Sequence, residues 1–169
     1  TRPCILVNFG GLRSPAMRPM ADHNYVSWTM GLLGAVGLDP SSLTVCLPVH
    51  LENQIVALQA TMPGVRIECP SMAEFHGYLS KSSVLVTVPG LETVLEGMHL
   101  GTPIIFLPPH NGTQVLQLSE YQRRGISIGS LVPPYLSELA VDTVDPSQLT
   151  GRVQKLNECA AHDESLRRV

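Results

Sequence analysis

Short apolar runs recur along the chain and are separated by segments with helical spacing. The runs cover residues 4–9, 43–48, 65–69, 83–88, 103–108 and 126–129. They contain many β-branched residues and do not alternate with polar ones. This pattern predicts strands buried on both faces, as in a parallel sheet that is covered by helices.

The segments between the runs predict helices. They lie at about 22–36, 51–60, 71–82, 91–100 and 113–125, and a further helix follows residue 145. Regular alternation of strand and helix predicts one doubly wound α/β domain over residues 1–169. We expect a six-stranded parallel sheet with helices on both faces, a Rossmann-like arrangement.

Two of these helices carry more detailed signals. Ser71 followed by Glu74 forms the pattern of a capping box at the start of the segment 71–82. The segment 91–100 has apolar residues at positions i, i+3, i+4 and i+7, which predict a buried stripe. The residues of this stripe are Leu91, Val94, Leu95 and Met98.

Composition and charge narrow the possible functions. A hydrophobic content of 44% is enough for a substantial core. The net charge of -3 and the aromatic content of 5% favour neither polyanion binding nor base stacking, so we expect no nucleic-acid partner. No apolar run approaches the roughly 18 residues of a membrane span. The four cysteines form no CxxC pair, which favours a reduced, cytoplasmic setting.

The first loop that follows a strand is FGGLRSP. Ligands of doubly wound sheets bind at the carboxyl ends of the strands, so such loops are candidate sites. Gly10 and Gly11 permit close approach of the backbone to a ligand, and Arg13 with Ser14 can reach anionic oxygen. A two-glycine loop alone is often a simple turn, and this one matches neither the dinucleotide fingerprint nor the phosphate loop.

The stretch VTVPGLETVLEG runs from the fourth strand through Pro-Gly into a helix. Gly90 leaves the helix N-terminus without a side-chain cap, and such an end binds phosphate well. Glu92 and Glu96 lie off the apolar stripe, one turn apart. A second interpretation is structural: Glu92 interacts with the helix dipole, and Glu96 faces water.

The fifth strand ends in LPPHNGTQVLQ, which places several uncharged hydrogen-bonding side chains at its carboxyl end. They suit sugar hydroxyls, because amides, like hydroxyls, both donate and accept. These residues are His110, Asn111, Thr113, Gln114 and Gln117. The alternative is a polar loop with helix-capping residues. No histidine has metal-like spacing, and no GxSxG nucleophile elbow is present.

Residues 4–125 resemble the donor half of GT-B-fold glycosyltransferases. The pattern is similar to that of the bacterial peptidoglycan N-acetylglucosaminyltransferase and of natural-product glycosyltransferases. In this family a strand leads to a glycine, a helix with Thr and Glu, "GxP", an apolar strand, a proline and a loop ending in Gln. The matching residues are Gly90, Thr93, Glu96, Gly101, Pro103, Pro108 and Gln114.

The resemblance implies a site for a nucleoside-diphosphate sugar, either a UDP- or a dTDP-sugar. Met72 would lie near the base, Glu96 would bind the ribose, and both glycine turns would meet the diphosphate. Gln114, with His110 and Asn111, would contact the sugar. The implied donor-binding residues are Gly10, Gly11, Arg13, Met72, Gly90, Leu91, Thr93, Glu96, His110, Asn111 and Gln114.

The resemblance also implies an inverting, metal-independent transfer of a hexosyl or N-acetylhexosaminyl group, with no cofactor. In this family the acceptor site and the base usually come from an N-terminal domain. We therefore expect an acceptor domain or partner subunit outside this chain, and an isolated chain that binds donor without transferring sugar.

Two other functions stay open. One is a nucleotide-sugar epimerase or hydrolase on the same architecture. The other is a non-catalytic domain that pairs with a partner chain. Three residues favour the non-catalytic domain. The family often has His or Arg before the glycine, where this chain has Val88 and Pro89, and often has Asp before the loop Gln, where this chain has Thr113. Glu92 places a negative charge beside the implied diphosphate.

Overall fold

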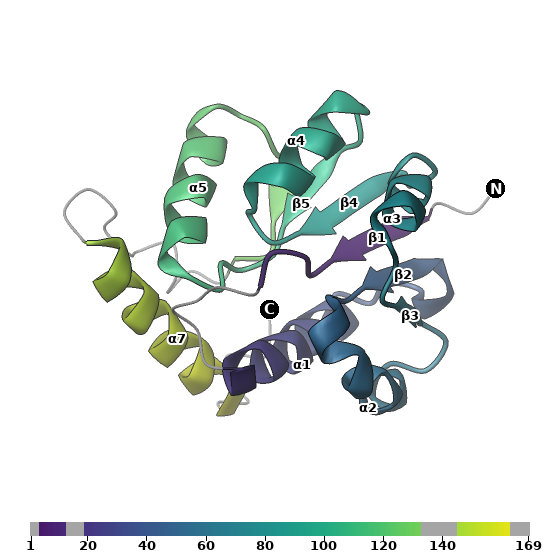
Figure 1. The fold of residues 1–169 in the computed structure, drawn as a ribbon, viewed down its shortest axis with the longest axis horizontal. Helices are drawn as coiled ribbons and strands as arrows, with labels where there is room; N and C mark the ends of the chain where they lie inside the picture. Colours follow the sequence, from purple (N-terminus) through teal and green to yellow (C-terminus); the bar gives the residue numbers. More distant parts are fainter. Residues whose placement is uncertain (1–3, 13–18, 133–144, 163–169) are drawn as a thin grey trace.

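A single parallel sheet forms the centre of the protein. The computed structural model describes residues 4–12, 19–132 and 145–162. The sheet is six-stranded with the order β3-β2-β1-β4-β5-β6, and every neighbouring pair is parallel (Figure 1). The strands are β1 (Ile5–Asn8), β2 (Leu43–Cys46), β3 (Arg66–Glu68), β4 (Val84–Thr87), β5 (Ile104–Phe106) and β6 (Gly129–Ser130).

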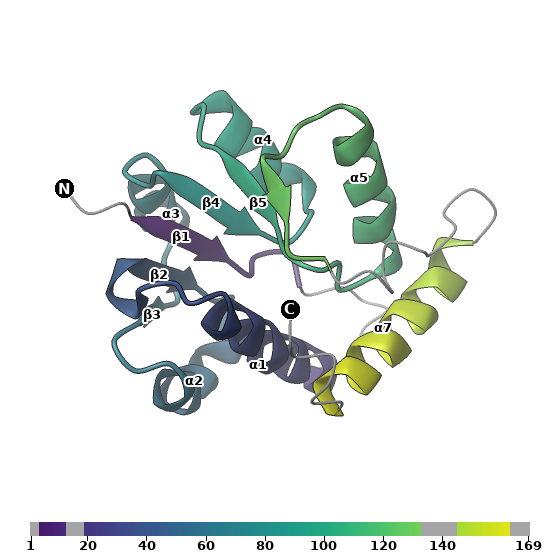
Figure 2. The same cartoon turned by 180° about the vertical axis from the view of Figure 1, so that it is seen from behind.

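Helices cover both faces of this sheet, which confirms the predicted doubly wound α/β fold. One face carries α1, α2 and α7, and the other carries α3, α4 and α5 (Figures 1 and 2). The helices are α1 (Pro19–Ala35), α2 (Ile55–Thr61), α3 (Met72–Leu79), α4 (Leu91–His99), α5 (Gly112–Arg123) and α7 (Pro146–His162), with short 3₁₀ helices η1 (Pro40–Ser42) and η2 (Val49–Gln54). None of the helices in the described part of the chain combines the length and apolar character needed to cross a bilayer.

The continuous apolar runs form strands that are buried on both faces, as predicted. Successive side chains of a strand point to opposite faces of a sheet. On β1, Leu6 packs with the α3–α5 layer and Val7 with the α1–α2 layer, and both are 0% exposed. A strand buried in this way has no solvent face, so its sequence does not alternate.

The predicted helix over 51–60 is interrupted, and the predicted sixth strand is displaced. Residues 49–54 form η2 before α2 begins. At the sheet edge, α5 is closed by Gly125, whose φ of 65° suits glycine. The chain then crosses to β5, and pairing begins only where Gly129 lies opposite Ile105. The strand is therefore Gly129–Ser130 instead of 126–129.

The predicted buried stripe of α4 is wrong in three of its four positions. Val94 is 0% exposed, but Leu91, Leu95 and Met98 are 55%, 52% and 47% exposed. The inward face of α4 is made by Val94 together with Gly97, which is also buried. Because glycine has no side chain, it allows close packing without contributing to a hydrophobic pattern, so the sequence indicated the wrong face.

The C-terminal helix belongs to this domain. α7 packs against α1 and α5, and Leu149, Val153 and Ala160 are 0% exposed. Asn157 of the same helix donates from Nδ2 to the Pro109 carbonyl at 3.2 Å. The sequence predicted the helix but gave no indication of what it contacts.

Candidate functional site

A cleft of about 600 Å³ lies along the carboxyl ends of the strands. It crosses the point between β1 and β4 where the strand order reverses, which is the usual ligand position in open α/β sheets. The predicted site residues that line it are Gly10, Gly11, Met72, Gly90, Leu91, Thr93, Glu96, Asn111 and Gln114. Arg13 lies outside the described residues. His110 does not line the cleft.

The character of the cleft changes along the sheet edge. The loops after β2 and β3 make an apolar end, and the loop after β5 makes an amide end. The apolar end consists of Cys46, Leu47, Pro48, Val49, Pro70, Met72 and Phe75. The amide end consists of Asn111, Thr113, Gln114 and Gln117. Burial raises the pKa of the Cys46 thiol to about 12, so the apolar end carries no charge near neutral pH.

The N-terminus of α4 opens onto the middle of the cleft without a side-chain cap. Gly90 is the N-cap, and no side chain in the described part of the chain makes a capping hydrogen bond to the first turn. By contrast, Ser71 caps α3 in the predicted capping box, and Asn111 caps α5. The first N–H groups of α4 and the positive end of its dipole therefore remain available to an anionic ligand.

Asn8 connects the two sides of the cleft and was missed in the sequence. Its Nδ2 donates to Thr93 Oγ1 at 3.0 Å, and its Oδ1 accepts from the Gly10 N–H at 3.0 Å. Because Thr93 Oγ1 accepts this bond, its own hydrogen stays free to donate to a ligand. The available signal was a polar residue at the carboxyl end of an otherwise apolar strand.

The described cleft residues carry two carboxylates and no cationic side chain. Glu92 and Glu96 both line the cleft. Glu96 Oε1 lies 2.9 Å from His76 Nε2, and these side chains are 28% and 52% exposed. The second Glu96 oxygen is left to accept hydrogen bonds from a ligand. Among the described residues of the cleft, only N–H and O–H donors are available to an anion in its middle.

Two amides of this end, Asn111 and Gln114, have side-chain oxygens that already accept from backbone N–H groups. Asn111 Oδ1 accepts from the Gln114 backbone N–H at 3.0 Å, and Gln114 Oε1 accepts from the His110 backbone N–H at 2.7 Å. A backbone N–H can only donate, so these bonds fix which side-chain atom is oxygen. The remaining hydrogen-bonding groups of both amides are NH₂ donors, and Gln114 Nε2 lies 3.4 Å from the Gly11 carbonyl.

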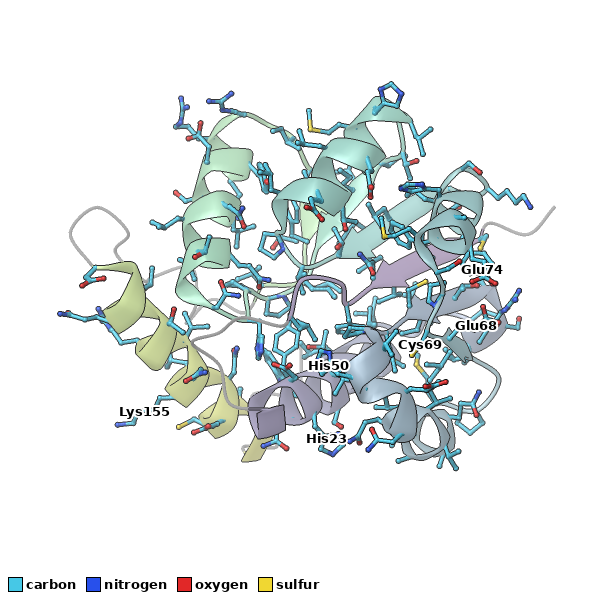
Figure 3. The ribbon with its side chains drawn as sticks, in the orientation of Figure 1. His23, His50, Glu68, Cys69, Glu74 and Lys155 are labelled. Carbon is cyan, nitrogen blue, oxygen red and sulfur yellow. The ribbon has the colours of Figure 1, made fainter. Side chains whose placement is uncertain are left out.

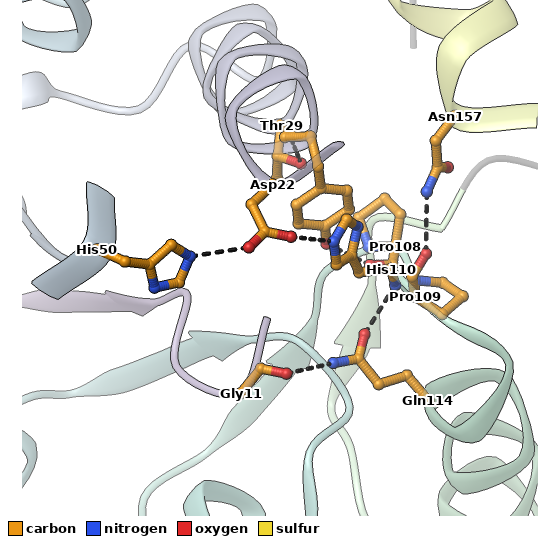
Figure 4. Close-up of polar contacts among 10 residues, drawn as sticks. Gly11, Asp22, Thr29, His50, Pro108, Pro109, His110, Gln114 and Asn157 are labelled. Carbon is orange, nitrogen blue, oxygen red and sulfur yellow. Dashed lines mark hydrogen bonds and ion pairs between the residues drawn. The ribbon is translucent and has the colours of Figure 1, made fainter. Parts of the chain in front are cut away.

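His110 is buried beneath the cleft in a pair of contacts centred on Asp22 of α1. Its side chain is 2% exposed, and its Nε2 lies 2.8 Å from Asp22 Oδ1. The other carboxylate oxygen, Oδ2, lies 2.8 Å from His50 Nε2 (Figure 4). Figure 3 shows His50 near the middle of the molecule, where the chain after β2 approaches α1. His50 does not line the cleft.

The Asp22 carboxyl is held in its charged form. Burial raises its pKa, but the hydrogen bonds with His110 and His50 outweigh burial and bring the pKa below its ordinary value of 3.8. The sequence did not reveal this cluster, because its members are 28 and 88 residues apart. Within the described ranges, no three His, Cys, Asp or Glu side chains are placed to hold a metal ion.

Comparison with known proteins supports the fold. No family model matches the sequence, and no curated protein sequence matches it. The glycosyltransferase of kitacinnamycin has a similar structure, with a TM-score of 0.52, 18% identity, and 99% of this chain covered against 38% of that chain. A putative UDP-N-acetylglucosamine 2-epimerase from Listeria monocytogenes has a TM-score of 0.42 and 14% identity, with 99% and 47% covered.

These comparisons define the fold and not the activity. At such identities a structural likeness carries no information about substrate. The chain spans 38% of the length of the kitacinnamycin glycosyltransferase, so it corresponds to one part of that longer protein. The chain has a Rossmann-like fold that it shares with part of the kitacinnamycin glycosyltransferase, so the resemblance in its sequence is confirmed at the level of the fold.

Proposed function

We propose that this domain binds a nucleoside-diphosphate sugar as the donor half of an inverting, metal-independent glycosyltransferase. The observation that carries the proposal is the order of chemistry along one cleft. The cleft begins with an apolar end, continues with the uncapped N–H groups of α4 and finishes with an amide end. The proposed ligand has the same order of parts, which are a base, a diphosphate and a sugar.

The base would lie at the apolar end, against Met72. Glu96 would accept hydrogen bonds from the ribose hydroxyls with the oxygen that His76 leaves free. Sugar hydroxyls at the other end would accept from the NH₂ groups of Asn111 and Gln114. Each assignment matches a donor to an acceptor.

Among the described residues, neutral donors would hold the diphosphate. The N-terminus of α4 and the Thr93 hydroxyl supply these donors, and Gly10 and Gly11 allow the backbone to approach. When the sugar transfers, the leaving nucleoside diphosphate gains negative charge. Preorganised N–H groups at a helix terminus stabilise such charge without reorganising.

The acceptor and the base that deprotonates it would come from an N-terminal domain or a partner subunit. The isolated chain is then expected to bind donor without turnover. Addition of a separately produced acceptor domain would restore transfer, and efficient transfer by the isolated chain would contradict this division of labour.

The test of the proposal is calorimetric titration with UDP, dTDP and GDP. We expect saturable binding of UDP or dTDP, and we expect Glu96→Ala to weaken it by at least about tenfold, the effect of losing a charged hydrogen-bond partner. Glu92→Ala is the matched control one turn earlier on α4. It removes a carboxylate that the proposal gives no ligand contact, and it reduces repulsion of the diphosphate, so affinity should stay equal or rise.

One observation favours a second candidate, a non-catalytic domain that pairs with a partner chain. Glu92 is exposed in the first turn of α4 and lines the cleft where the diphosphate would lie. Failure of all three nucleotides to bind would support this candidate and refute the donor site. Equal binding by wild type and Glu96→Ala would refute the role of Glu96.

A further inference from the structure

Asp22 reaches the cleft through two intermediate residues. Its Oδ1 contacts His110 Nε2 at 2.8 Å, and the backbone N–H of His110 donates to Gln114 Oε1 at 2.7 Å. Gln114 Nε2 then donates to the Gly11 carbonyl at 3.4 Å (Figure 4). Asp22, His110 and Gln114 are only 3%, 2% and 3% exposed, so bulk water cannot replace a lost partner.

The neighbouring prolines are held by other side chains. The Tyr25 hydroxyl donates to the Pro108 carbonyl, and Asn157 donates to the Pro109 carbonyl. These bonds fix the exit of β5 but do not engage the imidazole of His110. In the described part of the chain, Asp22 is the one hydrogen-bonding partner of that imidazole.

We infer that Asp22 is a positioning residue for the amide end of the cleft. By holding His110, it keeps the His110 N–H aimed at Gln114 Oε1, and this bond turns the Gln114 nitrogen toward the cleft. Loss of Asp22 leaves this buried imidazole without that hydrogen bond and only with its packing against the Tyr25 ring, so we expect His110 to shift. The identity of the ligand at this end rests on the proposed function.

The structure offers two matched control variants. His50→Ala removes the other partner of Asp22 and leaves the link to His110 in place. Asp22→Asn keeps a side-chain oxygen that accepts from the Nε2–H of His110. Its amide nitrogen donates to Nε2 of His50 when the His50 proton is on Nδ1. Asp22→Ala alone removes the link to His110.

The experiment compares dissociation constants for UDP and UDP-N-acetylglucosamine in these variants. In Asp22→Ala the sugar nucleotide should weaken about tenfold more than UDP, the effect of one misplaced hydrogen bond. In Asp22→Asn and His50→Ala the ratio of the two constants should stay at the wild-type value. Equal weakening of both ligands in Asp22→Ala would overturn the inference, because a general loss of structure does not distinguish them.

A second measurement does not depend on a ligand. The side-chain NH₂ signals of Gln114 in ¹H–¹⁵N spectra should shift or broaden in Asp22→Ala and stay near wild type in Asp22→Asn and His50→Ala. If wild type binds no nucleotide, the proposed function fails, and these signals then decide the inference by themselves. Unchanged Gln114 signals in a folded Asp22→Ala protein would refute it.

Discussion

Gly97 determines how closely α4 can approach the sheet, and its replacement by alanine tests that packing. A Cβ built at Gly97 would lie 2.9 Å from Leu85 Cδ2 and 3.2 Å from Ile104 Cδ1. Both neighbours are core residues, 0% and 2% exposed, and they belong to the cluster between the sheet and α3–α5. Both atoms are the ends of side chains packed in this cluster, so these side chains must shift to admit the new Cβ.

The size of the effect follows from two opposing terms. Overpacking a well-packed core costs about 1–3 kcal/mol, and contacts this short with two buried partners belong in the upper half of that range. Alanine is better than glycine in a helix by about 1 kcal/mol. We therefore expect Gly97→Ala to lower the free energy of unfolding by about 1–2 kcal/mol.

Gly77 provides the matched control. It lies inside α3, on the same face of the sheet, and a Cβ there meets nothing within 4 Å. Gly77→Ala should raise the free energy of unfolding by about 0.5–1 kcal/mol, since only the helix-propensity term applies. The two substitutions are chemically identical, so their opposite signs isolate the packing of α4.

Urea unfolding measures both variants. The single tryptophan, Trp28, is 5% exposed on α1 and reports loss of the core by fluorescence. Titration with UDP adds a functional readout, because a displaced α4 moves Thr93 and Glu96. A Gly97→Ala protein as stable as Gly77→Ala would refute the close packing of α4 against β4 and β5.

Two further expectations concern Asp22 and α4. The pKa of Asp22 is lower in the folded protein than its ordinary value of 3.8, so its stabilising effect is present above that pH and is lost as pH falls through the folded-state pKa. The stability advantage of wild type over Asp22→Asn should therefore shrink below about pH 4 in urea unfolding at pH 3 to 6. On α4, the Leu95 side chain is 52% exposed, and Leu95→Gln should change the free energy of unfolding by less than about 0.5 kcal/mol. The neighbouring Val94 side chain is 0% exposed, and Val94→Ala should lower the free energy of unfolding by at least about 1.5 kcal/mol.

The fold could be predicted because its strongest constraints act locally in the sequence. A strand buried on both faces requires an unbroken apolar run, and the alternation of such runs with helical segments leaves few arrangements. The capping box at Ser71 was visible for the same reason, since its two partners are three residues apart. β6 was misplaced because its position depends on pairing with Ile105.

The site could be predicted only in part, and the missing residues share a physical feature. Asn8 and Asp22 make contacts with residues 85 and 88 positions away, and only the folded chain brings these partners together. His110 was expected in the cleft because it lies in a polar loop, but its side chain turns inward to the buried Asp22 carboxylate. A buried anion needs such partners, and the sequence does not show which carboxylate will be buried.

The hydrogen-bond directions around the cleft favour a ligand that is held without a cationic side chain from the described residues. Because Thr93 Oγ1 accepts from Asn8, the Thr93 hydroxyl can donate its own hydrogen to a ligand. The oxygens of Asn111 and Gln114 accept from backbone N–H groups, so these two side chains offer their NH₂ groups. Carboxylates are the exception, and Glu96 is already placed as an acceptor by His76. In the proposed nucleotide sugar, the donors in the middle of the cleft would meet the phosphates, and the donors at the amide end would meet the sugar. Glu96 on α4 would accept from the ribose.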